Sequence, residues 1–149
     1  MGYTNYWKPN LKKINETVEF PKEMLVQMRN VAEQYNKGVI IDKTIAGPIV
    51  AIELNPKKIV VIGSSETFEF DLCKDSRMGD RIGVDSWKFC KTCRDPYDMA
   101  VKCFLMLLQK YGFITSWSHD DNNRCDTYKD AIRFAKRCGI DTRGLYARR

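Results

Sequence analysis

The sequence predicts a single α+β domain, in which a largely antiparallel sheet is packed by about three helices. A chain of 149 residues has the length of one domain. Its composition, 44% hydrophobic and 30% charged, is that of a globular protein. The expected order along the chain is helix, strands, helix, strand, helix. No apolar run approaches the roughly 20 residues of a membrane helix, so no membrane partner is expected.

The N-terminal part combines an aromatic segment with an amphipathic helix. Residues 2–10 are polar and aromatic, which predicts a strand or an ordered arm. The helix is expected from Pro21 to Lys37, because its apolar residues recur at helical spacing. Pro21 suits the first turn, and Gly38 is expected to end the helix.

The middle of the chain is β-like. Two β-branched runs, residues 49–54 and 58–62, are separated by Asn55-Pro56, which predicts a hairpin. Residues 66–70 alternate polar and apolar side chains, as a half-exposed strand does. Residues 73–86 are polar and predict a loop.

The C-terminal part begins with the clearest helix, from Pro96 to Tyr111, which Asp95 would cap. Its side chains are apolar nearly all round, including Cys103, so this helix is expected to be central and buried. A strand over 113–117 and a last helix over 127–138 follow. Thr127 with Asp130 would cap that last helix, and Gly139 would end it.

The six cysteines are expected to be reduced thiols of a cytoplasmic protein, because the first residues show no export signal. Cys90-x-x-Cys93 has no second cysteine pair of the kind that structural zinc sites use. We therefore predict no metal and no cofactor.

The net charge of +6 favours negatively charged partners. Residues 89–98 run into the start of the predicted central helix, where free N–H groups attract anions. Lys91, Thr92 and Arg94 would hold a phosphate there. The alternative is that Asp95 and Asp98 already satisfy those amides.

Two further groups of residues carry possible binding chemistry. Tyr3, Tyr6 and Trp7 would stack on a base, or they simply cover the sheet. His119 is the only histidine, and Asp120 beside it would tune it as an acid or base. A lone histidine in a polar loop is more often a surface residue.

The last predicted helix carries basic residues at helical spacing, namely Lys129, Arg133, Lys136 and Arg137. Such a stripe can grip nucleic-acid phosphates. A solvated surface is the favoured interpretation, because charged helix faces are usual in globular domains.

Three segments together resemble a family of small, mostly uncharacterised bacteriophage and bacterial proteins. They are Gly2-Tyr3-Thr4-Asn5-Tyr6-Trp7, Glu66-Thr67-Phe68, and Phe89-Cys90-Lys91-Thr92 with Pro96-Tyr97-Asp98. This chain departs from the family pattern at Asn5, where the family has histidine, at Cys93, where it has alanine, and at Asp95, where it has lysine. The resemblance implies a phage accessory protein acting in the host bacterial cytoplasm. By analogy, some small phage proteins sequester nucleotide signals of bacterial immunity.

The sequence therefore predicts a protein that binds an anionic nucleotide-like small molecule. The expected ligand-binding residues are Tyr3, Tyr6, Trp7, Glu66, Phe68, Lys91, Thr92, Arg94, Tyr97, His119 and Asp120. One alternative is a phosphodiesterase or hydrolase, with Glu66, His119 and Asp120 as acid and base groups. The other is a nucleic-acid or host-protein binder that uses the basic last helix. A homo-oligomer is left open.

Overall fold

The computed structural model describes residues 3–41, 48–63, 66–72, 88–92, 97–121 and 123–148. The elements are β1 (Thr4–Pro9), α1 (Leu11–Glu16), α2 (Lys22–Ile41), β2 (Ala51–Asn55), β3 (Lys58–Ile62), β4 (Phe68–Asp71), β5 (Lys88–Lys91), α4 (Tyr97–Lys110), β6 (Ile114–His119) and α5 (Asp126–Arg137). Within these ranges, no helix is both long enough and apolar enough to cross a bilayer.

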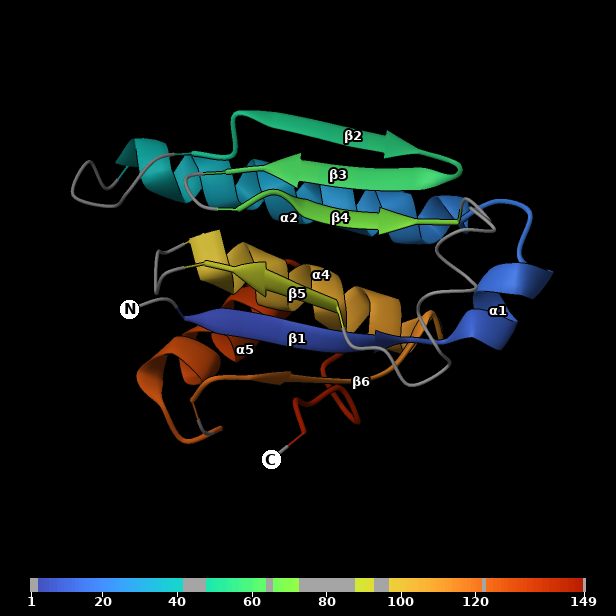
Figure 1. The fold of residues 1–149 in the computed structure, drawn as a ribbon. Helices are drawn as coiled ribbons and strands as arrows, with labels where there is room; N and C mark the ends of the chain where they lie inside the picture. The colour runs from blue at the N-terminus through green and yellow to red at the C-terminus, as the bar shows by residue number, and fades with distance from the viewer. Residues whose placement is uncertain are drawn as a thin grey trace.

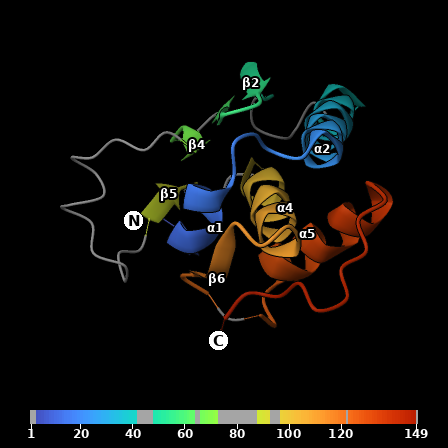
Figure 2. The same ribbon diagram turned by 90° about the vertical axis from the view of Figure 1, so that its right-hand side faces the viewer.

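The strands form two antiparallel sheets of three strands each, sheet A in the order β5-β1-β6 and sheet B in the order β2-β3-β4. In Figure 1 the two sheets lie one above the other, with α2, α4 and α5 behind them. Figure 2, turned by 90°, shows strands on one side and these helices on the other. The α+β prediction is confirmed, with two small sheets where one was expected.

The two sheets meet where sheet B approaches β5. The Lys91 N–H donates to Glu66 Oε2 at 2.7 Å, and the Glu66 N–H donates to the Lys91 carbonyl at 3.2 Å. The hydrophobic core is continuous between the two sheets. Phe68 of β4 packs on Trp7 of β1 (ring centroids 5.1 Å apart) and on Phe104 of α4 (5.9 Å). One core therefore serves both sheets.

Helix α4 is the centre of this core, as its apolar composition predicts. Every residue from Ala100 to Leu108 is buried, including Cys103. One departure from apolar composition is conspicuous, because Asp98 and Lys102 are also wholly buried on the same helix. These two charged residues define the interior polar site described below.

Several element boundaries differ from the sequence prediction. Helix α2 continues past Gly38 to Ile41, because that glycine does not take the positive φ with which a glycine ends a helix. Helix α5 begins at Asp126, and its N-cap is Cys125 in place of Thr127. The Cys125 sulfur accepts a hydrogen bond from the Tyr128 N–H at 3.4 Å.

Other differences concern the strands and the short helix. Strand β6 extends to His119, which is therefore a buried strand residue and not part of a polar loop. Helix α1 and strand β5 were not predicted, since each is only a few residues long and neither has a long apolar period. The predicted loop 73–86 and the Asp95 cap lie outside the described residues.

Candidate functional site

Strand β1 divides the predicted site residues between two faces of sheet A. Successive side chains of a strand point to opposite sides. Asn5 and Trp7 point towards the helices and are buried, and Tyr3 just before the strand is buried with them. Tyr6 and Lys8 point the other way and are partly exposed. We call the helix side the inner face and the opposite side the outer face.

The outer face is built by the register of the three strands. Tyr6 lies between Phe89 of β5 and Ser118 of β6, and Thr4 lies opposite Lys91. With Lys8, its partner Ser116, and Asp120 at the end of β6, these residues make up the outer face. The Phe89 side chain is 56% exposed. Two aromatic rings therefore lie side by side on an open sheet surface.

Polar groups fix the geometry at one end of the outer face. Asp120 Oδ2 accepts the Thr4 N–H at 2.9 Å. Tyr6 also hydrogen-bonds to Asp120, and this bond, together with burial, raises the pKa of the Tyr6 phenol. At the same end, Glu66 accepts the Lys91 N–H. Asp120 thus holds β1 through the Thr4 backbone and the Tyr6 side chain, and Glu66 holds the Lys91 backbone through one carboxylate oxygen.

The inner face carries a buried polar cluster. Its members are Tyr3, Asn5, Thr92, Asp98, Lys102 and His119. The Lys102 ammonium donates to Asp98 Oδ2 at 2.5 Å and to Asn5 Oδ1 at 2.8 Å, and it lies 4.4 Å from the centre of the Tyr3 ring. Asp98 Oδ1 accepts from Asn5 Nδ2 at 2.5 Å and from the Thr92 hydroxyl at 2.6 Å.

This cluster satisfies its own hydrogen bonds. Burial lowers the pKa of Lys102, and the attraction of Asp98 opposes that shift. Throughout the described ranges, no buried side-chain nitrogen or oxygen lacks a partner. A charge removed from water costs several kcal/mol unless it is paired and hydrogen-bonded, which the cluster achieves without a ligand. We therefore assign the cluster a structural role, joining β1, β5, β6 and α4.

His119 belongs to the same interior. Its Nδ1 lies 2.6 Å from the Tyr3 hydroxyl and its Nε2 lies 2.8 Å from Asn123 Oδ1. Because the Asn123 amide nitrogen donates to the Ala147 carbonyl, its oxygen faces the ring, so Nε2 carries the proton and Nδ1 accepts from Tyr3. Burial lowers the pKa of His119, which favours this neutral form.

These positions separate the groups of the hydrolase alternative. His119 faces the helices, whereas Asp120 and Glu66 are exposed on the other side of the sheet. Glu66 lies beside β5 and Asp120 follows β6, with β1 between those strands. No single bound group can reach all three side chains in this arrangement.

The predicted site residues thus fall into two sets. Tyr6, Lys91 and Asp120 lie on the outer face with Glu66 beside them, and the structure brings these four together. The others are buried: Tyr3, Trp7, Phe68, Thr92, Tyr97 and His119. Tyr97, for instance, packs in the core and donates its hydroxyl to the Val61 carbonyl at 3.0 Å. Arg94 lies outside the described residues.

Sequence reasoning missed Phe89 and the charged pair of α4. Alternation around an inward Cys90 would have placed Phe89 outward, beside Tyr6. Asp98 and Lys102 are four residues apart in a helix that is otherwise apolar, which is the pattern of a buried ion pair. The Phe89 signal depends on knowing that residues 88–91 form a strand, whereas the spacing of Asp98 and Lys102 could have been read from the predicted helix alone.

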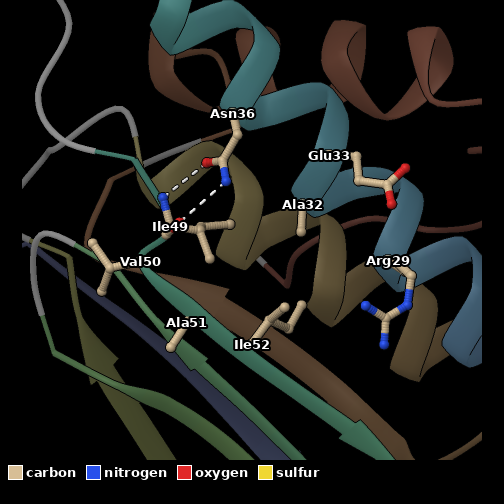
Figure 3. Close-up of a pocket in the computed structure, with 8 residues that line it drawn as sticks. All are labelled: Arg29, Ala32, Glu33, Asn36, Ile49, Val50, Ala51 and Ile52. Carbon is tan, nitrogen blue, oxygen red and sulfur yellow. Dashed lines mark hydrogen bonds between the residues drawn. The ribbon is translucent and has the colours of Figure 1, made fainter.

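A separate hollow of about 270 Å³ lies between α2 and β2 (Figure 3). Asn36 reaches across it, accepting the Ile49 N–H at 2.9 Å and donating to the Ile49 carbonyl at 3.1 Å. Arg29 and Glu33 of α2 line the hollow, and none of the predicted site residues does. The described residues contain no group of three or more histidine, cysteine or acidic side chains suited to a metal ion.

The basic side chains of α5 are exposed and partly paired. Arg133 donates to Asp130 at 2.8 Å, and the Arg137 guanidinium lies 5.7 Å from the Phe134 ring. Figure 2 shows α5 with the helices, away from the outer face of sheet A. A ligand on that face would not reach α5.

The outer face therefore combines adjacent aromatic rings, basic residues and acceptor oxygens on strands that are held rigidly from behind. Comparison of the chain with protein-family models, curated proteins and solved structures finds no match.

Proposed function

We propose that this protein binds an anionic nucleotide-like ligand on the outer face of sheet A. The supporting observation is the pair of rings, Tyr6 and Phe89, which occupy directly opposite positions on neighbouring strands. Aromatic side chains on an open sheet stack on nucleobases, and each stacked base contributes about 1–3 kcal/mol. A ring pair flanked by lysines is thus suited to a flat base attached to a phosphate.

The charges on the outer face fit the two ends of such a ligand. Lys8 and Lys91 provide cations on either side of the rings, in a protein of net charge +6. Glu66 accepts the Lys91 N–H through Oε2, and its carboxylate has a second oxygen. We expect that oxygen to accept a hydrogen bond from a base or ribose donor, and the lysines to contact phosphate.

The buried polar cluster would serve this function by positioning the outer face. Asn5 lies between Thr4 and Tyr6 in β1, Thr92 follows Lys91, and His119 precedes Asp120. Each buried hydrogen bond thus fixes a backbone segment whose neighbour points outward. Preorganised binding groups lose less conformational freedom on binding, which strengthens the complex.

Binding without chemistry is the form that the geometry supports better, because His119 is separated from the acidic groups. In a phage accessory protein, which the sequence resembles, such binding would sequester a nucleotide signal of the host. Competition with a host receptor requires a dissociation constant between about micromolar and nanomolar, corresponding to about −8 to −12 kcal/mol.

The test is mass spectrometry of small molecules that remain with the purified protein, followed by calorimetric titration with nucleotides. Phe89→Ala should lower the affinity, while Tyr146→Ala, which removes a ring that is 64% exposed elsewhere, should not. Ligand recovered intact after heating supports sequestration. A new cleavage product would instead establish the hydrolase, and the absence of nucleotide binding would reject the proposal.

A further inference from the structure

We infer that the ligand of the outer face is single-stranded nucleic acid, an inference that rests on the proposed function and names its ligand class. Three features of the outer face lead to it: two neighbouring aromatic side chains, lysines on both sides of them, and the exposure of the Phe89 ring.

The rings provide stacking surfaces for two successive bases. Directly opposite side chains of an antiparallel pair have their β-carbons about 4.5–5.5 Å apart. Tyr6 and Phe89 are such a pair. Two rings at that separation can each receive one of two adjacent bases, whereas a mononucleotide would use only one of them.

The lysines extend the site beyond one nucleotide. Lys91 is opposite Thr4, and Lys8 is four residues further along β1, with the ring pair between them. At the rise of a β-strand, these positions are about 13 Å apart along β1. Lysines at this spacing, one beyond each end of the ring pair, are placed to contact successive phosphates of a nucleic-acid strand.

The exposed ring favours a single strand over a duplex. Bases within a duplex are stacked on each other, so they are not available to side chains on an open sheet. Many proteins bind single-stranded nucleic acid by stacking its bases on aromatic side chains, while basic residues nearby contact its phosphates. The outer face, with exposed Phe89 at its centre, presents this combination.

The experiment is a fluorescence anisotropy titration with a labelled ten-nucleotide strand, made as both DNA and RNA. Unlabelled adenosine monophosphate, a cyclic dinucleotide and a matching duplex serve as competitors. We expect the single strand to bind at least tenfold more tightly than each competitor, and its affinity to fall with added salt. Isothermal titration of the same competitors measures their direct binding.

Variants identify the surface that binds. Phe89→Ala should weaken strand binding by roughly 5- to 150-fold, as expected for the loss of one stacked base. Lys8→Gln should reduce the slope of log K against log salt by about 0.7, the value for one phosphate contact on a single strand. Tyr146→Ala and Lys136→Gln are the matched controls and should change neither. Melting temperatures verify that every variant is folded.

The outcomes separate this inference from the proposed function. Equal or tighter binding of the mononucleotide or the cyclic dinucleotide would overturn the inference and leave the proposed function standing. If no nucleotide of any kind bound, both would be rejected. The inference would also be overturned if Lys136→Gln abolished binding of the nucleic-acid strand and Phe89→Ala did not. That result would place the contact on α5.

Discussion

The Lys102 ammonium has no contact with solvent and depends on Asp98, Asn5 and the Tyr3 ring for its stabilisation. Such a pair is a weak source of net stability, because desolvation offsets most of the attraction between the charges. Removing one partner is far worse, since it leaves an isolated charge in the core. We therefore expect the pair to fix the arrangement of the strands around it more than to add net stability.

Asp98→Ala should therefore destabilise the protein by about 3–5 kcal/mol. Urea unfolding measures this loss. Asp130→Ala is the matched control, because Asp130 forms an exposed pair with Arg133, and it should cost less than about 1 kcal/mol. Replacing Asp98 by leucine and Lys102 by methionine together should cost less than the sum of the single changes. Additive losses would show that the two charges do not interact.

His119 should make stability depend on pH in a window where few other groups titrate. Burial lowers its pKa in the folded protein below the ordinary 6.5. When the pH falls below about 6.5, the unfolded chain binds a proton that the folded protein does not. The contribution of His119 to stability should therefore be complete above about pH 7.5 and decline as the pH falls below about 6.5, by at most about 1.4 kcal/mol per pH unit.

The measurement is a series of urea unfolding curves at closely spaced pH values. Because His119 is the only histidine, His119→Gln should remove this slope, while its amide can still donate to Asn123. A slope that persists in this variant would place its origin in other groups.

At the level of single residues, the sequence singled out His119, Thr92 and the aromatic residues of β1. It could not assign their side chains to one face of the sheet, because the neighbouring strands were unknown. The side depends on pairing across long stretches of chain, as in the contact between Asn5 and Asp98. Phe89 was overlooked for the same reason.

Among the elements, the end of β3 and the start of α4 approach each other unusually closely. A β-carbon added to Gly63 would lie 2.5 Å from the Tyr97 ring, which is itself fixed by its hydrogen bond to Val61. The contact joins sheet B to the central helix. It accounts for a glycine at the end of a β-branched strand, where the backbone itself does not require one.

Gly63→Ala should accordingly destabilise the protein by about 1–3 kcal/mol through overpacking. Gly38→Ala is the control, because nothing lies within 4 Å of its added β-carbon near the C-terminal end of α2. That change should stabilise the helix by about 0.5–1 kcal/mol. Thermal unfolding compares the two. An unaffected Gly63→Ala protein would mean that the Tyr97 ring moves easily.

Elements with a clear apolar pattern or a turn sequence beside them were predictable, and elements without such a signal were not. The buried helix α4 and the hairpin of β2 and β3 follow from apolar composition and a turn sequence. Strand β5 has four residues, and its identity depends on pairing with β1. The start of α5 was misplaced because Cys125, a weak acceptor, serves as its cap.

For the whole molecule, the shared core implies that the two sheets unfold together. Phe68 of sheet B contacts Trp7 of sheet A and Phe104 of α4. Phe68→Ala should cost about 3–5 kcal/mol and lower the stability of both sheets. Tryptophan fluorescence, to which Trp7 and Trp117 contribute, and far-ultraviolet circular dichroism should then give the same midpoint. Two separate midpoints would show that the sheets are independent units.

The arrangement of β1 also constrains how the gene can change. Inserting or deleting one codon within this strand would exchange its two sets of side chains, moving Lys8 and Tyr6 into the interior and expelling Asn5 and Trp7. Such a change would disrupt the hydrophobic core and the outer face at the same time. Related genes should therefore differ in this segment by substitution alone, with any length variation confined to the connections around it.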